Sequence, residues 1–119
     1  MKENKHRVVF QLNTEDINDH NALMTYVSNV KRHWGDNVDI HVVVHGPGIG
    51  MVMKSKTMVG DALKNVIQKG IKFFACQNTM NARMIDKNDI IEEVSFVESG
   101  LVDIIEKQEN GWAYIKCNL

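Results

Sequence analysis

The stretch Gly70-Ile71-Lys72-Phe73-Phe74-Ala75-Cys76-Gln77-Asn78-Thr79 decides the fold. Its apolar run from Ile71 to Ala75 lies between a glycine and a group of polar residues, which is typical of a strand buried in a parallel sheet. Cys76 comes at the end of this strand. In open α/β sheets, ligands bind beyond the carboxyl ends of the strands. The stretch therefore predicts a cysteine at the edge where such sheets carry their sites.

The residues after Cys76 predict a helix that begins close to the thiol. Asn78 or Thr79 is the expected N-cap of a helical segment at residues 80–85. The free N–H groups of a helix N-terminus favour a thiolate, and Arg83 in the same segment is expected to offset its charge. The alternative is a buried and inert cysteine, and on chemistry alone the two interpretations are evenly balanced.

The rest of the chain alternates strands and helices. Strands are expected at residues 7–12, 38–45, 94–97 and 112–117, and helices at 17–34 and around 59–67. A last helix is expected to be capped by Ser99 and ended by Gly111, with four apolar residues facing the sheet: Leu101, Val102, Ile104 and Ile105. Helices between successive strands imply a parallel sheet in a three-layer α/β/α domain.

Size and composition indicate one ordinary globular domain spanning residues 1–119. The chain has 44% hydrophobic and 24% charged residues. Its net charge of −1 gives no electrostatic attraction to nucleic acid or anionic lipid. No apolar run approaches the roughly 18 residues that a membrane span requires. We therefore expect a cytoplasmic protein with no direct nucleic-acid partner and no membrane partner.

The cysteines and histidines do not form a metal-binding pattern. Cys76 and Cys117 are too few for a disulfide framework and lack zinc spacing, although a disulfide between them remains open. His41 and His45 share one face of a strand, but two histidines without a third ligand make a poor zinc site. His45 also ends its strand, so the topology allows it to approach Cys76 as a base. We expect neither a metal nor a cofactor.

The turn Gly46-Pro47-Gly48-Ile49-Gly50 matches neither common phosphate-binding motif. Met51 stands where a dinucleotide-binding motif needs its third glycine, and no Gly-Lys-Ser/Thr follows as in a P-loop. A tight connection between strand and helix is the favoured interpretation. Because the turn also follows a strand, we expect it to shape a pocket with the residues after Cys76, so the candidate substrate-binding residues are Gly46, Pro47, Gly48, Gln77, Asn78, Thr79 and Arg83.

Four segments together resemble the DsrE/DsrF-like family of small α/β proteins: residues 45–48, 70–79, 99–102 and 108–115. The Ala-Cys-x-Asn-Thr and Gln-x-x-Gly-Trp-Ala-Tyr patterns within them are specific as a pair. The resemblance is greatest to the stand-alone branch of the family rather than to subunits of sulfur-relay complexes. One departure is Glu98, which stands where the resemblance predicts a proline.

The resemblance implies a three-layer α/β/α sandwich with a mostly parallel five-stranded sheet. It also implies assembly into a homotrimer or homohexamer. In relay members of the family a cysteine carries persulfide sulfur, and that role maps by position onto Cys76. The implied partners are a sulfur-donor protein and a sulfur-acceptor protein.

Three functional hypotheses follow. The first is a sulfurtransferase-like sulfur carrier in which Cys76 takes sulfur as a persulfide and passes it on. The second is a non-catalytic homo-oligomeric module in which Cys76 is inert and a pocket holds a small ligand or a partner loop. The third is a redox sensor in which Cys76 is oxidised reversibly.

Overall fold

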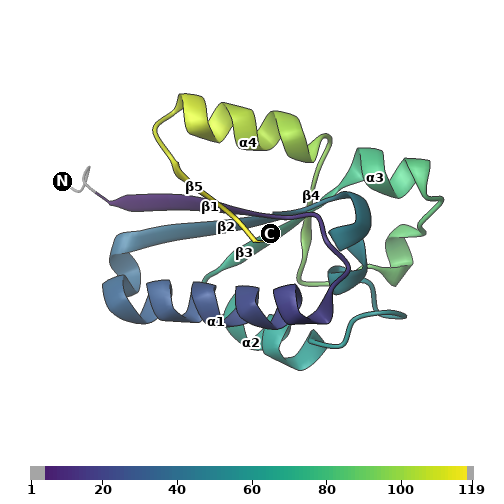
Figure 1. Cartoon of the computed structure of the whole chain (residues 1–119), viewed down its shortest axis with the longest axis horizontal. Helices are drawn as coiled ribbons and strands as arrows, with labels where there is room; N and C mark the ends of the chain where they lie inside the picture. The colour runs from purple at the N-terminus through teal and green to yellow at the C-terminus, as the bar shows by residue number, and fades with distance from the viewer. Residues whose placement is uncertain (1–4, 118–119) are drawn as a thin grey trace.

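A five-stranded parallel sheet forms the centre of the computed structural model, which describes residues 5–117 (Figure 1). The strands lie in the order β4-β3-β2-β1-β5, and all four pairings between neighbours are parallel. The strands are β1 (His6–Leu12), β2 (Val38–Val44), β3 (Lys72–Cys76), β4 (Ser95–Val97) and β5 (Ala113–Lys116). The predicted α/β class is confirmed.

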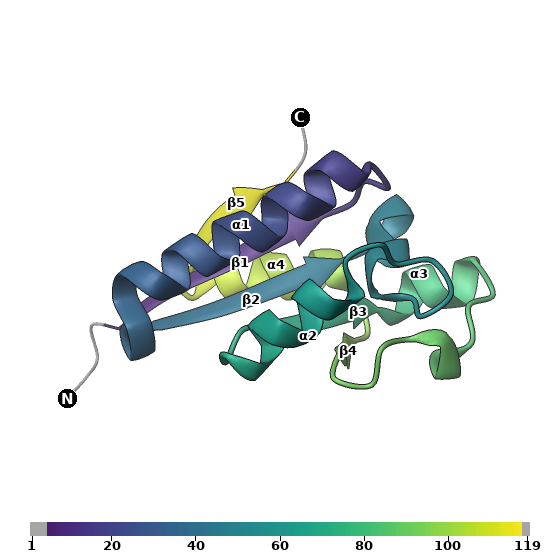
Figure 2. The same ribbon diagram turned by 90° about the horizontal axis from the view of Figure 1, so that it is seen from below.

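Helices cover both faces of the sheet. In Figures 1 and 2, α1 and α2 lie on one face, α4 lies on the other, and α3 lies beyond the carboxyl end of β3. Within residues 5–117, no helix is both long and apolar enough to cross a membrane. The helices are α1 (Ile17–Trp34), α2 (Gly60–Gln68), α3 (Gln77–Ala82) and α4 (Gly100–Glu109), and the 3₁₀ segments are η1 (Gly35–Asn37), η2 (Gly46–Val52) and η3 (Lys87–Asp89).

Helix α1 has the predicted bounds because both of its ends carry clear capping signals. Asp16 accepts a hydrogen bond from the backbone N–H of Asn18 at 2.8 Å, and Gly35 ends the helix with a φ of +58°. Trp34 continues the three- and four-residue spacing of Leu23, Val27 and Val30, which predicts an apolar stripe facing the core. In the structure its side chain is 40% exposed and stacks on the His6 ring at 3.7 Å, so this part of the prediction is wrong.

The hydrophobic core is unequal on the two faces of the sheet. The larger cluster fills the side of α1 and α2, and the smaller one lies on the α4 side, with Phe74 and Trp112 packed against it. The most deeply buried members of the larger cluster include Phe10, Leu12, Leu23, Leu63 and Phe73, and the smaller cluster consists of Val9, Val43 and Ile104.

Helix α4 turns most of its apolar residues away from the sheet. The sequence predicted that Leu101, Val102, Ile104 and Ile105 would all face it, and this is wrong for three of them. Ile104 is buried, whereas Leu101, Val102 and Ile105 are 57%, 50% and 54% exposed. Because a helix turns about 100° per residue, only positions one turn apart share its inner face, and Gly100 and Ile104 hold those positions.

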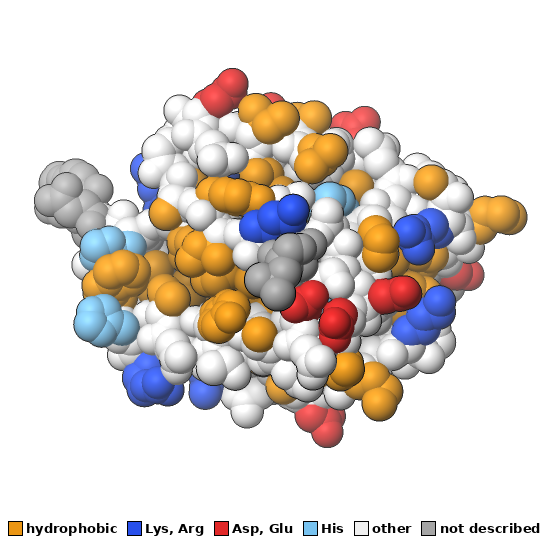
Figure 3. All heavy atoms as spheres, in the orientation of Figure 1, with side chains coloured by type: hydrophobic (Ala, Val, Ile, Leu, Met, Phe, Trp, Pro, Cys, Tyr) orange, Lys and Arg blue, Asp and Glu red, His pale blue; other side chains and the backbone are white. Residues whose placement is uncertain are grey.

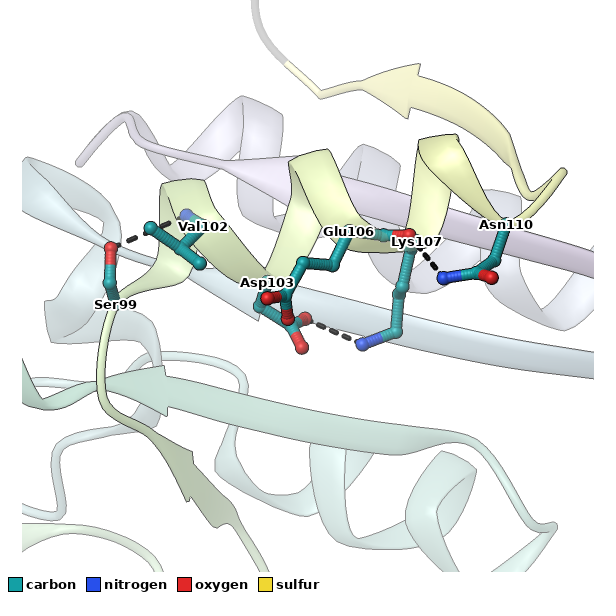
Figure 4. A network of polar contacts seen from close by, with 6 residues as sticks. All are labelled: Ser99, Val102, Asp103, Glu106, Lys107 and Asn110. Carbon is teal, nitrogen blue, oxygen red and sulfur yellow. Dashed lines mark hydrogen bonds and ion pairs between the residues drawn. The ribbon is translucent and has the colours of Figure 1, made fainter.

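Polar contacts fix the start and the middle of α4 (Figure 4). The Ser99 hydroxyl accepts a hydrogen bond from the N–H of Val102 at 3.3 Å, as an N-cap does, so the predicted cap is confirmed. Lys107 lies 2.6 Å from the carboxylate of Asp103, one turn away, and both side chains are largely buried. Both contacts lie within α4 and its cap, so they stabilise the helix itself rather than its packing on the sheet.

Candidate functional site

Cys76 is both the last residue of β3 and the N-cap of α3. The sequence predicted Asn78 or Thr79 as the cap, and this is wrong because the helix begins at Gln77, directly after the strand. The Cys76 backbone is still extended, with φ −78° and ψ 116°, so the chain passes from strand to helix at this residue. The thiol therefore occupies the place where a serine or aspartate side chain normally meets the first N–H groups of a helix.

A second helix N-terminus also reaches the sulfur. The backbone N–H of Gly100, the first residue of α4, donates a hydrogen bond to Sγ of Cys76 at 3.2 Å. The sheet explains this contact, because Cys76 pairs with Val97 of β4, and α4 starts shortly after that strand. Sγ thus lies between the first turns of α3 and α4.

These surroundings set the acidity of the thiol. Cys76 is only 5% exposed, and burial by itself raises the pKa of its thiol. Hydrogen bonding opposes burial, first from Gly100 and then from the backbone and hydroxyl of Thr79 and the backbone of Asn78. The net effect lowers the pKa of Cys76 below its ordinary value of 9.0. Backbone N–H groups, rather than a cationic side chain, favour the thiolate here.

Gly100 allows α4 to come this close. A Cβ built on it would lie 3.0 Å from Cγ1 of Val43 and 3.4 Å from the Cβ atoms of both Cys76 and His45. Even a methyl group would require α4 or these neighbours to shift by a few tenths of an ångström, so a glycine fits best here. The same contacts bring Cys76 and His45 next to each other under the start of α4.

His45 lies beside Cys76 but is not hydrogen-bonded to its thiol. It belongs to a row of hydrogen-bonded side chains that continues through Gln11 to Tyr114. Nε2 of Gln11 donates a hydrogen bond to Nε2 of His45 at 2.7 Å, and the hydroxyl of Tyr114 donates one to Oε1 of Gln11. Burial lowers the pKa of His45, which keeps the ring neutral near neutral pH. No hydrogen bond within residues 5–117 joins this ring to Cys76, so the geometry differs from that of a cysteine–histidine nucleophile.

The Gly46-Pro47-Gly48 turn is attached to the same edge of the sheet. The N–H of Gly46 donates to the hydroxyl of Thr79 at 2.9 Å, which links the turn to a residue that contacts the thiol. Gly48 packs so closely on β1 that an added Cβ would lie 2.6 Å from the carbonyl oxygen of Leu12. Both contacts agree with the predicted tight connection between strand and helix.

The structure gathers some of the predicted site residues and separates others. Gly46, Asn78 and Thr79 surround Cys76 through direct or shared hydrogen bonds. Arg83 is the C-cap of α3 and therefore lies at the opposite end of this helix from the thiol. Gln77 begins α3 and is half-buried, and for it no side-chain hydrogen bond is found within residues 5–117. The functional roles of these residues remain predictions.

A cavity of about 600 Å³ opens beside the same end of the sheet. Pro47 and Arg83 line it, but Cys76 does not. The turn therefore contacts the thiol region through Gly46 and the cavity through Pro47. The thiol site and the cavity are neighbouring features of the molecule that share walls, not one pocket.

Cys117 lies too far from Cys76 for a disulfide within the chain. It follows β5, which is separated from β3 by β2 and β1, and strands spaced about 4.8 Å apart put the two residues roughly 14 Å from each other. A disulfide needs Cα atoms within about 7 Å. Both cysteines are free thiols. In residues 5–117 no three histidine, cysteine or acidic side chains gather as a metal site would require.

The sequence did not lead us to predict that Gly100 donates to the thiol, or that Gln11 and Tyr114 extend a hydrogen-bonded row from His45. The signal for Gly100 was available, because Ser99 was recognised as a helix cap that follows a strand neighbouring the cysteine strand. Gln11 and Tyr114 gave no such signal. Their contact depends on β5 returning to pair with β1, and a local pattern does not reveal that pairing.

The fold and the site define a small parallel α/β protein with a buried, hydrogen-bonded cysteine at the carboxyl edge of its sheet. The chain belongs to the DsrE/DsrF-like family, whose family model matches residues 7–117. The resemblance stated from its motifs is therefore confirmed.

Solved structures share this fold. MTH1491 from Methanobacterium thermoautotrophicum, a protein of unknown function, is 31% identical with a TM-score of 0.88, over 93% of this chain and 98% of that one. BT1422 from Bacteroides thetaiotaomicron, also of unknown function, is 21% identical with a TM-score of 0.76, over 98% and 97%. The ychN protein from E. coli is 11% identical with a TM-score of 0.74, over 94% and 98%. No curated protein matches significantly.

Proposed function

We propose that this protein is a sulfur carrier in which Cys76 holds sulfane sulfur as a persulfide. The observation that carries the proposal is the hydrogen bond from Gly100 N–H to Sγ at 3.2 Å, together with the lowered pKa of the thiol. Thiol exchange requires a thiolate that another sulfur compound can reach. Family membership supports the same chemistry, because relay members carry sulfur on a cysteine at this position.

The reaction balances without an external oxidant. The Cys76 thiolate attacks the outer sulfur of a donor persulfide, a new S–S bond forms to Cys76, and the donor S–S bond breaks. The electron pair of that bond leaves on the donor thiolate, and the hydrogen stays on the transferred sulfur. An acceptor thiolate then repeats the exchange on the outer sulfur and regenerates the Cys76 thiolate. The N–H of Gly100, supported by Thr79, stabilises the anion before the attack and after release.

The proposal includes the donor and acceptor proteins that membership of the DsrE/DsrF-like family suggests, and their sulfur must reach a residue that is only 5% exposed. A partner must present its sulfur along the edge of the sheet between the first turns of α3 and α4. A reducing cytoplasm suits such a carrier, since it keeps thiols free. Gly46 and Thr79 shape the approach through their shared hydrogen bond.

Intact mass spectrometry tests the carrier directly. Incubation with a small persulfide such as glutathione persulfide should add the mass of one sulfur atom to the wild-type chain. The Cys117→Ser variant should take up the same sulfur, and the Cys76→Ser variant should take up none. Absence of the adduct from folded wild-type protein would refute the carrier.

A second candidate function is a binding module in which Cys76 does no chemistry. The observation that favours it is the cavity of about 600 Å³, which Cys76 does not line. A volume of this size falls in the range of small-ligand sites, roughly 300 to 1,000 Å³. A folded chain that binds a ligand in this cavity and never accepts sulfur would support this function over the carrier.

We also propose that the chain forms a homotrimer or homohexamer. The supporting observation is an exposed apolar surface on α4 and β5, where Leu101, Val102 and Ile105 are at least half exposed and Tyr114 is 36% exposed. Figure 3 shows hydrophobic side chains gathered over the α4 side of the molecule. Such surfaces commonly mark interfaces. Sedimentation equilibrium should give a multiple of the chain mass, and Ile105→Glu should lower it; a stable monomer would refute assembly.

A further inference from the structure

Four side chains from neighbouring parts of the sheet form a row near its carboxyl edge. Cys76 ends β3, His45 follows β2, Gln11 lies near the end of β1 and Tyr114 lies in β5. Hydrogen bonds join the last three of them, and Cys76 and His45 lie side by side under Gly100 of α4. The sulfur-carrier proposal uses only the first of the four.

Gln11 fixes the direction of the hydrogen bonds in this row. Its side chain is buried, with 9% of the residue exposed. Its Oε1 accepts from the hydroxyl of Tyr114, so its amide nitrogen is the atom that meets Nε2 of His45 at 2.7 Å. An amide nitrogen only donates, and therefore Nε2 of His45 must accept. Burial lowers the pKa of His45, which favours the neutral ring that this arrangement needs.

These directions leave one place for the proton of the neutral ring. A neutral imidazole has one N–H and one acceptor nitrogen, so with Nε2 as the acceptor the proton is on Nδ1. A histidine side chain free in water prefers the opposite arrangement. Within residues 5–117 no hydrogen bond reaches Nδ1 of His45, and this atom is not among the buried polar atoms that lack a partner. The ring therefore has an N–H that no described residue accepts.

The position of this ring suits a sulfur compound bound to Cys76. Neighbouring strands lie about 4.8 Å apart and an S–S bond is about 2 Å long, so a sulfur bonded to Sγ can be reached from the adjacent strand. Sγ itself already accepts a hydrogen bond from Gly100. When an S–S bond at this place breaks, negative charge develops on the leaving sulfur, and a fixed N–H donor stabilises such charge.

We propose that Gln11 and Tyr114 are positioning residues that hold His45 as a hydrogen-bond donor, through Nδ1, to the sulfur that leaves during persulfide exchange at Cys76. The role in transfer rests on the sulfur-carrier proposal, whereas the position of the proton does not. The donor S–S bond breaks, its electron pair goes to the donor thiolate, and that thiolate accepts the hydrogen bond from Nδ1–H. No proton changes place. His45 thus acts as a donor and not as the general base of a cysteine–histidine pair.

NMR spectroscopy of the full chain, labelled with ¹⁵N, measures where the proton lies. Two-bond ¹H–¹⁵N correlations near neutral pH should show Nδ1 of His45 protonated and Nε2 unprotonated, and His45→Asn assigns the signals by removing them. Gln11→Glu should place a proton on Nε2, because a carboxylate of similar shape can only accept. A wild-type proton on Nε2 would overturn the proposal, as would an unprotonated Nε2 in folded Gln11→Glu.

Tyr114→Phe tests the outer end of the row. Without this hydroxyl, Oε1 of Gln11 loses its donor, so the amide is free to turn and both tautomers of His45 should become populated. Tyr26→Phe is the matched control, because Tyr26 is a tyrosine on α1 that is 48% exposed, and it should leave the His45 signals unchanged. The amide spectrum of each variant reports whether it is folded. A wild-type tautomer in folded Tyr114→Phe would overturn the role of Tyr114.

Transfer kinetics test the role of the N–H. Mass spectrometry over time follows the uptake of sulfur by Cys76 from glutathione persulfide. His45→Leu should slow uptake about tenfold, as expected for the loss of one hydrogen bond to a developing charge. His45→Asn should restore most of the rate, because the side-chain nitrogen of asparagine lies close to the place of Nδ1 and donates. Equal slowing in both variants, or slowing in neither, would overturn the donor role.

Two comparisons separate this inference from a structural effect and from the carrier proposal. Labelling of Cys76 by iodoacetamide releases no thiolate, so His45→Leu should change it far less than it changes sulfur uptake. A wild-type chain that takes up no sulfur would refute the carrier together with this role of His45, and the proton on Nδ1 would still be measured. A wild-type chain that takes up sulfur no faster than His45→Leu would refute the role of His45 and leave the carrier standing.

Discussion

The two cysteines of this chain are nearly equal in burial and opposite in acidity. Cys76 and Cys117 are 5% and 4% exposed. Burial, and to a smaller extent the charge of Asp19, raises the pKa of Cys117 to about 11. For Cys76 burial acts in the same direction, but hydrogen bonds from Gly100, Thr79 and Asn78 outweigh it and the pKa is lowered.

Position at the helix termini, not exposure, therefore separates the thiol whose pKa is lowered from the thiol whose pKa is raised. Cys117 follows the edge strand β5, and its own N–H donates to the carbonyl of Gln11 at 2.8 Å. Its sulfur packs in the main core. Cys76 ends an inner strand, where two helices begin.

The largest expected effect is selective alkylation of the native protein. The pKa of Cys76 is lowered whereas that of Cys117 is raised to about 11, so near neutral pH iodoacetamide should label Cys76 on the order of 100-fold faster than Cys117. Peptide mass spectrometry over time measures both rates in one sample. Cys76→Ser should remove the fast phase, and Cys117→Ser should keep it. Equal rates would contradict the contrast.

Alkaline pH should destabilise the protein through Cys117. Its thiol ionises near 9.0 when unfolded and at about 11 when folded, so the unfolded chain loses its proton first as the pH rises. Stability should fall across that window by roughly 2 to 3 kcal/mol. Urea unfolding at several pH values measures this loss, and Cys117→Ala should reduce it. Cys76→Ala should leave the decline in place, since the lowered pKa of Cys76 adds stability only as the pH rises toward 9.0.

Gly100→Ala should turn Cys76 toward the behaviour of Cys117. The added Cβ lies 3.0 Å from Cγ1 of Val43, so α4 or the Val43 side chain must shift by a few tenths of an ångström, and we expect the hydrogen bond from Gly100 to Sγ to lengthen and weaken. The thiol pKa should rise, and labelling near neutral pH should slow about tenfold. Overpacking should also cost about 1 to 3 kcal/mol of stability. The pH dependence of alkylation measures the first effect, and urea unfolding measures the second.

The control for this variant is Gly50→Ala, because the nearest atom to a Cβ at Gly50 is 3.8 Å away. It should leave the pH profile of Cys76 alkylation unchanged. A folded Gly100→Ala protein with the wild-type profile would show that α4 does not control the thiol.

The smallest effect is expected from Thr79→Val, which keeps the shape of the side chain and removes its hydroxyl. The N–H of Gly46 loses its acceptor, and the thiol loses one of several donors. Alkylation of Cys76 should slow a few-fold, and stability should fall by about 1 kcal/mol. Thr25→Val is the matched control, because its hydroxyl bonds only within α1. If Thr79→Val slowed the alkylation of Cys76 more than Gly100→Ala does, α3 rather than α4 would contribute most to the low pKa of the thiol.

Local patterns in the sequence predicted the strands and the longest helix because each carries its own signal. The apolar run before Cys76 and the caps of α1 depend on neighbouring residues, and their positions in the structure follow. The same reasoning failed at α3, where a cysteine rather than a polar side chain serves as the N-cap. Capping preferences do not predict a thiol at that position.

The candidate site was only partly predictable because its main contact joins segments far apart in the sequence. Gly100 reaches Cys76 only after β4 pairs with β3, and Gln11 reaches Tyr114 only after β5 pairs with β1. The prediction that all four apolar residues of α4 face the sheet failed for a related reason. Four apolar residues in one turn and a half cannot all face inward, and the pairing of Gly100 with the sheet decides which ones do.

The separation of the two cysteines on the sheet has a consequence for how long sulfur would stay on the protein. A persulfide next to a second thiol collapses to a disulfide and releases hydrosulfide, so its lifetime is fixed within the molecule. Here two strands lie between β3 and β5, and Cys117 is kept protonated in the core. If Cys76 carries sulfur as proposed, the persulfide would have no discharge route through Cys117, and its residence time would be set by collision with another molecule.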